Sequence, residues 1–437
     1  MIRRIRTTDA DAPERIARIV GRASLDRTVD DTVLAVLAEV RNGGDAALIA
    51  TTARFDDVSL SADRLQVSRA ELDAAVAAVA PRDREAIDAA CSRIEAFHRR
   101  EIHTSWWIER EDGAAFGQRV LALARVGIYA PGGVAAYPSS VLMAAVPARL
   151  AGVGEAILVT PPRGDGSVDP HVLYAASRCG VDRVYRIGGA QAIAALAYGT
   201  QTVPRVDKIV GPGNAYVNAA KRLVFGVVGI DALAGPSEVT VLADETAPAE
   251  WVAADLLSQA EHDKAATCVL VTPSERLASD VAGALTRRIV TLRRRETIRR
   301  ALEDRGAILV TEDLDEAIDL CNRIAPEHLE VLTRAPRSLL PRLRHAGMIL
   351  LGADSPVAAC DYGAGPNHIL PTGGTARFAS PLGVDDFLVR SNVMALRTAT
   401  LDEDAGSFRR LAALEGFGAH AAAIAVRKEV QDGNNDS

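Results

Sequence analysis

Features that mark several large classes of protein are scarce in this sequence. Its 437 residues include only five cysteines, at positions 91, 179, 268, 321 and 360, with no Cys-X-X-Cys pair. Neither a disulfide framework nor a cysteine zinc site is indicated, and this usage is typical of a reducing cytoplasm. Aromatic residues make up 4% of the chain, so we expect a mainly aliphatic core.

Long apolar runs and extended basic blocks are also missing. The most apolar stretch, residues 141–161, is interrupted by a proline, an arginine, a glycine and a glutamate, so it is too broken to span a bilayer. The N-terminus lacks the apolar region of a signal peptide. Arginine runs are short and the net charge is −7. We therefore expect no membrane and no nucleic acid among the partners.

The residues that are present point to a folded α/β protein. Apolar residues make up 48% and charged residues 24%, as in ordinary globular domains, and the length predicts two to four domains. Helical periodicity covers 31–52, with an interruption at Gly43-Gly44, and then 68–100. Beyond these, short β-rich runs alternate with helical stretches. The expected strands are 126–129, 156–160, 184–187, 208–210, 239–243, 268–272, 307–311, 328–332 and 348–351.

This alternation predicts two doubly wound, Rossmann-like domains with mostly parallel sheets. The expected parts are an N-terminal arm over 1–27, a first α/β domain over 28–128 and 237–382, a second over 129–236, and a C-terminal helical tail over 383–437. Glycine turns follow three expected strands, at 129–133, 188–191 and 211–214. Ligands of open α/β sheets bind at the carboxyl ends of strands, so these turns are candidate binding loops.

Two pairs of polar residues lie in the expected catalytic half. Gln259 and His262 are three residues apart on an expected helix, so they share a face that could bind a metal. For this pair alone, a plain polar helix face is the commoner explanation. Asp361 and His368 belong to a long glycine-rich loop, and such loops in compact domains are more often functional than incidental.

Two further pairs combine a glutamate with a histidine. Glu327 and His328 precede an expected strand and could supply a general base, although a hydrogen-bonded histidine at a strand edge explains them equally well. Glu415 and His420 flank two glycines in the tail, where they matter only if the tail docks on a catalytic domain of this chain or of a partner. The imidazole, carboxylate and amide groups together suit a divalent cation, with zinc the default.

A standard dinucleotide fingerprint is missing. Gly211-Pro-Gly213 supplies only two of its three glycines. Asp231 lies at about the right distance, but the glycines on either side of it suggest a loop rather than the end of a strand. By pattern alone the support for NAD is weak. The P-loop pattern is also absent, which argues against a phosphoryl-transfer ATPase.

Taken together, these blocks resemble histidinol dehydrogenase, the zinc- and NAD-dependent enzyme that completes histidine biosynthesis. The resemblance runs over about residues 25–425, and the order and spacing of the blocks are specific. The segments that carry it are 127–133 (GIYAPGG), 188–192 (GGAQA), 211–217 (GPGNAYV), 234–238 (AGPSE), 255–262 (DLLSQAEH), 325–330 (APEHLE), 361–374 and 415–420.

The resemblance implies a four-electron oxidation of L-histidinol to L-histidine, through histidinal, with two NAD+. It also implies a homodimer in which the tail of one subunit completes the partner's site, and NAD binding on a Rossmann-like domain without the usual fingerprint. The implied acid/base pair is Glu327 and His328. The implied NAD contacts are Tyr129, Gln191 and Asn214. The implied ligands of one Zn2+ per subunit are Gln259, His262, Asp361 and His420. Implied substrate-binding residues are these four ligands with Ser237, His328, His368 and Glu415.

Three other functions stay open on the sequence. A zinc hydrolase would use metal ligands and a glutamate, but four protein ligands leave little room for an activated water, and the glycine-ended strands would have no role. A relative within the family could oxidise another small alcohol with NAD. A non-catalytic NAD-binding interaction module would not need the Glu327-His328 pair.

Overall fold

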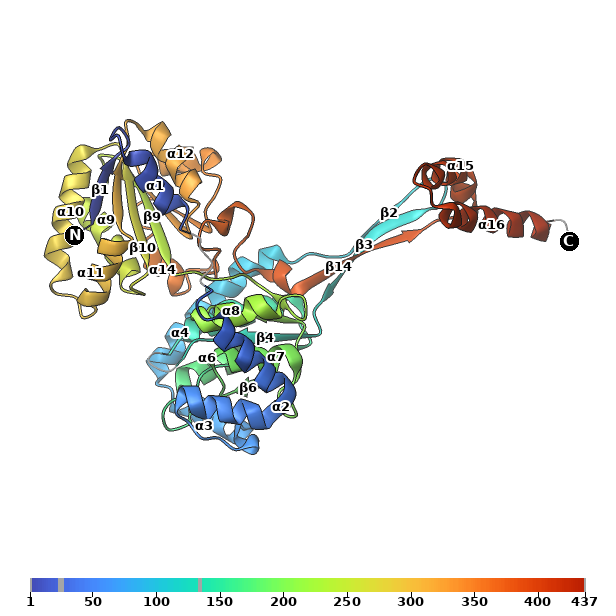
Figure 1. Ribbon diagram of the computed structural model, residues 1–437, viewed down its shortest axis with the longest axis horizontal. Helices are drawn as coiled ribbons and strands as arrows, with labels where there is room; N and C mark the ends of the chain where they lie inside the picture. The colour runs from blue at the N-terminus through green and yellow to red at the C-terminus, as the bar shows by residue number, and fades with distance from the viewer. Residues whose placement is uncertain (1, 23–26, 133–135, 436–437) are drawn as a thin grey trace. The chain divides into compact units, whose positions relative to one another are not determined.

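The computed structural model describes residues 2–22, 27–132 and 136–435, so Gly133 of the first glycine turn lies outside the described residues (Figure 1). The chain divides into two compact units, Met1–Ile102 with Leu123–Phe387, and His103–Ala122 with Leu388–Ser437. The expected α/β class with mostly parallel sheets is confirmed, and each of the nine expected strands coincides with an observed one. In the described part of the chain, no helix is both long and apolar enough to cross a membrane.

A six-stranded parallel sheet forms one half of the first unit, in the order β1-β11-β10-β9-β12-β13. Its strands are β1 (Arg3–Arg6), β9 (Glu238–Ala243), β10 (Thr267–Thr272), β11 (Ala307–Val310), β12 (His328–Leu332) and β13 (Met348–Leu351). Helices α9 (Ala249–Ala260), α10 (Glu275–Ile289) and α11 (Arg295–Asp304) cover one face, and α1 (Ala12–Val20) and α12 (Leu314–Ile324) the other. Every residue of β9, β10 and β12 is buried, as in parallel strands covered on both faces.

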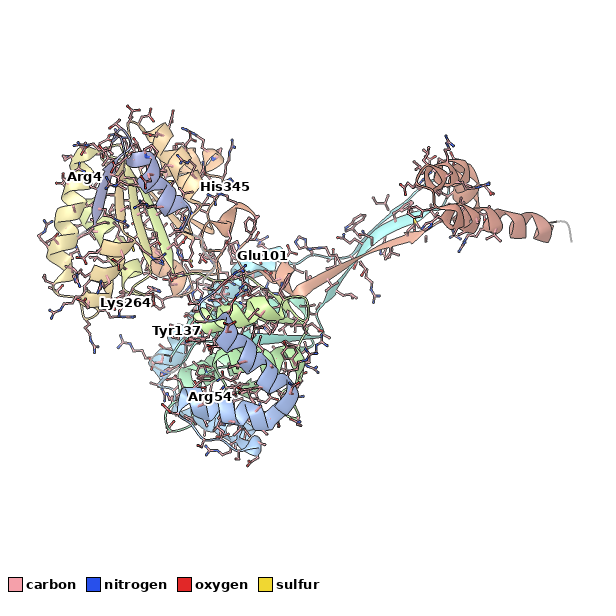
Figure 2. The ribbon with its side chains drawn as sticks, in the orientation of Figure 1. Arg4, Arg54, Glu101, Tyr137, Lys264 and His345 are labelled. Atoms are coloured by element: carbon pink, nitrogen blue, oxygen red, sulfur yellow. The ribbon has the colours of Figure 1, made fainter. Side chains whose placement is uncertain are left out.

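The N-terminal segment belongs to this sheet, whereas the sequence analysis expected a separate arm over 1–27. Strand β1 pairs in parallel with β11, which places Ile5 opposite Leu309. Arg4, labelled in Figure 2, extends from β1 and donates through Nη1 to Ser279 Oγ on α10 at 3.1 Å. Ile5 and one face of α1 are buried in the core, so these residues form an edge strand and a covering helix.

A five-stranded parallel sheet forms the other half of the first unit, in the order β6-β5-β4-β7-β8. Its strands are β4 (Arg125–Tyr129), β5 (Glu155–Val159), β6 (Arg183–Tyr185), β7 (Lys208–Val210) and β8 (Gly229–Ile230). Helices α2 (Asp30–Asp56), α7 (Gly189–Tyr198) and α8 (Ala215–Val224) share one core with it. Helices α4 (Pro81–His98), α5 (Pro138–Ala151) and α6 (Pro170–Cys179), with α3 (Arg69–Ala78) beside α6, lie on the other face.

Helices α2, α3 and α4 pack on this five-stranded sheet and residues 125–128 form part of its strand β4, whereas the sequence analysis grouped 28–128 with 237–382. Val33, Val36 and Leu37 of α2 enter the core that contains α7 and α8, and Cys91 and Ile94 of α4 enter the core around α5. Amphipathic periodicity shows that a helix covers a sheet, but it does not say which sheet.

The kink expected at Gly43-Gly44 is present inside α2. Gly44 has φ +55°, and the side chain of Gln201 occupies the space that a Cβ would need. Shorter elements complete the first unit. They are the helices α13 (Pro336–Leu339) and α14 (Val357–Asp361) and the 3-10 helices η1 (Ala62–Arg64), η2 (Arg99–Glu101), η3 (Leu340–Arg342), η4 (Thr375–Arg377) and η5 (Val384–Phe387).

The second unit is a three-stranded antiparallel sheet with two helices, which the sequence analysis did not foresee as a sheet. Strands β2 (Trp106–Glu109), β3 (Ala115–Ala122) and β14 (Leu388–Ala395) lie in the order β14-β3-β2, and α15 (Thr398–Leu414) and α16 (Gly418–Asn435) follow. Of the residues described here, only Ala114, Gly117, Thr400 and Ala405 are buried. This unit therefore has almost no hydrophobic core of its own.

Candidate active site

Glu327 and His328 meet Glu238 where β12 and β9 begin, at the amino edge of the six-stranded sheet. The two strands are parallel neighbours, with His328 opposite Val239. The backbone N–H of Glu238 donates to Glu327 Oε2 at 2.7 Å, and its carbonyl oxygen lies 3.0 Å from His328 Nδ1. Because a carbonyl oxygen only accepts, Nδ1 carries the proton. The nitrogen left for chemistry is therefore Nε2.

The surroundings of His328 control its charge. The ring is buried, and Nε2 has no hydrogen-bond partner among the described residues. Asp361 Oδ1 lies 4.0 Å from Nε2, and Glu327 Oε2 lies 3.6 Å from Nδ1. Burial alone would lower the pKa of His328, but the carboxylate of Glu327 and, to a smaller extent, that of Asp361 raise it well above the usual histidine value. Without a cation these carboxylates favour the protonated ring, whereas a divalent ion held by Asp361 would offset their charge and leave Nε2 able to accept a proton.

Gln259, His262 and Asp361 converge on the same edge because of helix direction. Helix α9 follows β9 and runs back toward the amino edge, so Gln259 in its last turn and His262 just beyond it arrive there. Asp361 ends the short helix α14, which follows β13 in the same way. His262 Nε2 lies 3.9 Å from Asp361 Oδ2. The C-terminus of a helix also carries partial negative charge, which favours a cation.

The donor set fits a divalent metal. Gln259 Oε1 is buried without a hydrogen-bond partner among the described residues, and an unsatisfied buried oxygen costs about 1–3 kcal/mol unless something binds it. Within the described residues, no three His, Cys, Asp or Glu side chains are arranged to hold a metal. Of the four expected ligands, only His262 and Asp361 are of these types in the first unit, so this is compatible with a site that also uses an amide.

His368 and Ser237, two expected substrate-binding residues, are each held by a backbone hydrogen bond. His368 Nδ1 lies 2.9 Å from the backbone carbonyl of Asp361, so it donates there and leaves Nε2 free. Burial lowers the pKa of His368 below the usual value, although the carboxylate of Asp361 opposes this, and the neutral form is favoured. Ser237 directly precedes β9, and its carbonyl accepts from Thr267 N–H at 3.0 Å.

Glu415 and His420 lie in the second unit. Glu415 caps the end of α15, and His420 stands in the first turn of α16, with its ring 5.2 Å from that of Phe417. Both side chains are exposed. The expected zinc ligands are therefore divided, with three in the first unit and His420 in the second.

Tyr129, Gln191 and Asn214 lie at or just beyond the carboxyl ends of strands of the five-stranded sheet. The chain lays down β4, β5 and β6 in one direction and then places β7 on the other side of β4. The carboxyl ends of β4 and β7 therefore form a topological switch point, where open α/β sheets bind ligands. Tyr129 ends β4, and Asn214 follows β7 as the N-cap of α8. Gln191 lies in the first turn of α7.

These three side chains also hold the loops in place. Tyr129 Oη accepts from the Gly189 N–H at 3.2 Å, and burial raises the pKa of this phenol to about 12. Gln191 Nε2 donates to Asp56 Oδ2 at 3.1 Å. Asn214 Oδ1 accepts from the backbone of α8. Tyr129 and Gln191 are buried, so they shape the floor of the loop region.

The Gly211 turn is fixed by a buried ion pair that the sequence analysis missed. Gly211 has φ +113°, and a Cβ there would lie 2.1 Å from the Tyr129 carbonyl oxygen. Lys221 Nζ donates to the Gly211 carbonyl at 3.0 Å, and Asp231 Oδ2 accepts from the Gly211 N–H at 2.7 Å. Lys221 and Asp231 also pair with each other and are almost fully buried. Asp231 therefore anchors the loop and is not free to bind a ribose.

A second buried pair, Glu330 and Asp255, lies close in sequence to the candidate site residues His328 and Gln259. Glu330 is two residues after His328 on β12, and it shares a hydrogen bond with Asp255, which lies one helical turn before Gln259 on α9. Burial raises the pKa of Glu330 to about 9, and the negative charge of Asp255 adds to the effect. Burial and the neighbouring carboxylate therefore favour the neutral, protonated form of Glu330 at neutral pH.

Glu330→Gln is expected to stabilise the protein at alkaline pH. Between the ordinary glutamate pKa and about 9, the unfolded state releases the Glu330 proton while the folded state keeps it, so wild-type stability falls as pH rises through this window. Glutamine stays neutral and can still donate. We expect its melting temperature to exceed that of the wild type by at least about 2 °C near pH 8, with the difference disappearing toward pH 5.

The measurement is thermal unfolding at several pH values. Glu312→Gln, at an exposed position, is the matched control and should leave the pH profile unchanged. A Glu330→Gln variant whose stability falls with pH as steeply as the wild type would contradict the neutral-acid assignment.

The chain is similar to known proteins along nearly its whole length. The family model described as histidinol dehydrogenase matches residues 21–428. The histidinol dehydrogenase of Geobacillus kaustophilus is 51% identical over 422 residues, covering 95% of this chain and 99% of that protein. That of Bacillus subtilis is 48% identical over 414 residues, covering 93% and 96%.

A solved structure agrees with the sequence comparison. The crystal structure of histidinol dehydrogenase from Elizabethkingia anophelis superposes with a TM-score of 0.93 at 34% sequence identity and covers 99% of both chains. The resemblance carried by the sequence blocks is thereby confirmed. The chain belongs to the histidinol dehydrogenase family.

Proposed function

We propose that this protein oxidises L-histidinol to L-histidine, through histidinal, with two NAD+ and one water, using one Zn2+ per subunit in a homodimer. The observation that carries the proposal is the amino edge of the six-stranded sheet. There, a buried imidazole with a free Nε2, a neighbouring glutamate and three potential metal-ligand side chains converge within one unit. Such a constellation suits an alcohol oxidation that needs a base and a fixed substrate.

The metal would be held by Gln259, His262, Asp361 and a His420. When bound, zinc would position the substrate by coordinating its imidazole and amino nitrogens. The unpartnered Gln259 oxygen and the approach of His262 to Asp361 support this ligand set. Ser237, His368 and Glu415 would hold the remaining polar groups of the substrate.

His328 would act as the base in both oxidations. Its Nδ1–H is held by the Glu238 carbonyl, so Nε2 is aimed to accept the proton of the substrate hydroxyl as hydride leaves the carbinol carbon. Histidinal is a reactive aldehyde and should remain bound. Glu327 would take a proton from water as the water attacks the aldehyde carbon, and the protonated His328 would return its proton to the carbonyl oxygen, giving a gem-diol and a neutral imidazole. His328 would then accept a hydroxyl proton from the diol in the second hydride transfer.

NAD+ would bind at the switch point of the five-stranded sheet, through Tyr129, Gln191 and Asn214. The first turn of α7 supports this, because Gly188 caps the helix without a side-chain hydrogen bond. Backbone N–H groups at a helix N-terminus favour phosphate oxygens. The rigid Gly211 turn would bring the backbone close to the dinucleotide without a full glycine fingerprint.

A second copy of the chain would complete the site. In the second unit, Trp106, Trp107 and Ile108 of β2 are about half exposed or more, and so are Leu411 and Leu414 of α15. An apolar surface on a unit with so few buried residues is typical of a subunit interface. Glu415 and His420 lie in this same unit, so the dimer would bring them to the partner's active site. All five cysteines are free and buried, which fits a reducing cytoplasm.

The direct test is NAD+ reduction by L-histidinol, followed at 340 nm before and after metal stripping. Two NADH per histidinol, formed only by the metal-loaded dimer, are the expected result. One NADH per substrate, or faster oxidation of another small alcohol, would favour the alternative of a family relative with a different substrate. Size-exclusion chromatography with light scattering tests the dimer on the same sample.

Asp231→Asn is expected to weaken NAD+ binding selectively. The substitution leaves Lys221 buried without its counter-charge, which costs about 3–5 kcal/mol in comparable buried pairs, and it loosens the Gly211 turn. We expect the KM for NAD+ to rise at least about tenfold, with a KM for histidinol close to that of the wild type. Steady-state kinetics with each substrate varied in turn provides the measurement.

Arg222→Met is the matched control for this test. Arg222 lies beside Lys221 on α8 and pairs with Asp30 of α2, and among the described residues it makes no hydrogen bond to the Gly211 turn. Its KM for NAD+ should stay near the wild-type value. Equal changes in both KM values for Asp231→Asn would argue for a general loss of structure instead.

A further inference from the structure

Glu238 is the centre of a hydrogen-bond network that surrounds the candidate catalytic pair. Its backbone contacts both members, through the N–H to Glu327 Oε2 and the carbonyl to His328 Nδ1. Its carboxylate accepts from the backbone N–H of Glu327 at 3.4 Å and of Gly373 at 3.1 Å. One residue at the start of β9 thus touches the acid, the base and the loop that carries His368.

The Glu238 carboxylate is neutralised by an arginine from the N-terminal segment. Arg22 Nε donates to Glu238 Oε1 at 2.7 Å and Nη2 donates to Oε2 at 2.6 Å, so the pair is bidentate. Each side chain is only 5% exposed. Bidentate pairs fix orientation as well as charge, and a buried pair becomes strongly unfavourable when one partner is removed.

Arg22 also bridges two neighbouring backbone segments. Its Nη1 donates to the carbonyl of Ile19 at the end of α1 and to that of Ile324 at the end of α12. Ile324 lies three residues before Glu327. The guanidinium therefore ties the N-terminal helix to the turn that enters β12, and it uses all three nitrogens in doing so.

We propose that Arg22 and Glu238 are positioning residues that fix Glu327 and His328 in the geometry needed for the two oxidations. Without Arg22, the buried Glu238 carboxylate lies uncompensated beside Glu327, and both must shift to reach solvent or another partner. The Nδ1–H hydrogen bond that orients His328 belongs to the same residue and shifts with it. This inference rests on the proposed roles of Glu327 and His328, and neither Arg22 nor Glu238 contacts the substrate in it.

The test uses the full-length, zinc-loaded enzyme and the variants Arg22→Met, Arg22→Ala and Glu238→Gln. We expect kcat to fall about 10²-fold, the loss associated with misplacement of reacting groups by about 1 Å. Zinc content and the KM for NAD+ should stay within about twofold of wild type, because neither expected site includes Arg22 or Glu238. Millimolar guanidinium chloride should restore part of the activity of Arg22→Ala in a saturable manner and leave the wild type unaffected.

Two further variants separate a loss of positioning from a loss of folding. Arg22→Lys retains the charge but cannot form the bidentate pair, so it should fold and show an intermediate kcat if the larger substitutions do not fold. Arg18→Met, whose pair with Glu14 is more than two-thirds exposed, should behave as wild type. If all folded Arg22 and Glu238 variants keep wild-type kcat while Glu327→Gln is impaired, the positioning role is wrong and the catalytic pair stands. If Glu327→Gln is itself fully active, the proposed function fails first.

Discussion

His328→Ala is expected to lower the rate of NADH formation from L-histidinol by about 10²–10⁴-fold, the usual contribution of a positioned general base. The physical reason is the single free nitrogen of this ring, since Nδ1–H is committed to the Glu238 carbonyl and Nε2 has no other partner among the described residues. Both hydride transfers would need that nitrogen, so both should slow. Single-turnover measurements starting from histidinol and from histidinal check the two steps separately.

Glu327→Gln is the comparison variant, because it should impair a different step of the reaction from His328→Ala. It should slow hydration of the aldehyde more than the first oxidation, so histidinal would accumulate or escape during turnover. The backbone hydrogen bonds of Glu327 do not depend on its carboxyl charge. If His328→Ala retained the wild-type rate in both half-reactions, or if the two variants lost the same steps to the same extent, the assigned division of labour would be wrong.

Removal of the metal is expected to have an effect of similar size. Chelator treatment should reduce turnover by at least about 10²-fold, because zinc is expected to supply several kcal/mol of positioning and charge stabilisation, and added Zn2+ should restore it. His262→Ala and Asp361→Ala should each lower the bound zinc measured by elemental analysis. Gln259→Ala should also weaken retention, since its buried amide oxygen has no other partner in the described chain.

His345 supplies the control for the ligand variants. It lies in the first unit (Figure 2) and lines a surface hollow together with Arg344 and Arg377, and none of the expected ligands lines that hollow. His345→Ala should therefore retain zinc and activity. Full zinc occupancy in both His262→Ala and Asp361→Ala would rule out the expected ligand set.

Local sequence patterns were sufficient for most strands. β9, β10 and β12 are short apolar runs that are buried along their whole length, and such runs stand out because both faces of a covered parallel strand are apolar. β1 was missed because its four residues, RRIR, bury only Ile5 at the edge of the sheet. β2 was missed as well, since all four of its residues are exposed. Strands with little burial leave little signal.

The candidate site shows a similar division. Gln259 with His262 and Glu327 with His328 are near neighbours in sequence and could be found as pairs. Their meeting with Asp361, about a hundred positions from Gln259, depended on resemblance to a family and not on spacing. The Arg22–Glu238 pair joins residues 216 positions apart, and no local sequence pattern predicts it.

The sequence by itself determined nine of the eleven strands of the two parallel sheets, their glycine turns and the short polar blocks, because these depend on neighbours within a few residues. Only the tertiary structure decided that α2 and α4 cover the five-stranded sheet, that the N-terminal segment supplies an edge strand, and that the candidate catalytic pair lies at the amino edge in contact with Glu238. Each of these depends on contacts between apolar faces or buried charges that are far apart in the sequence. The free energy of such contacts is set by the whole fold rather than by any one segment.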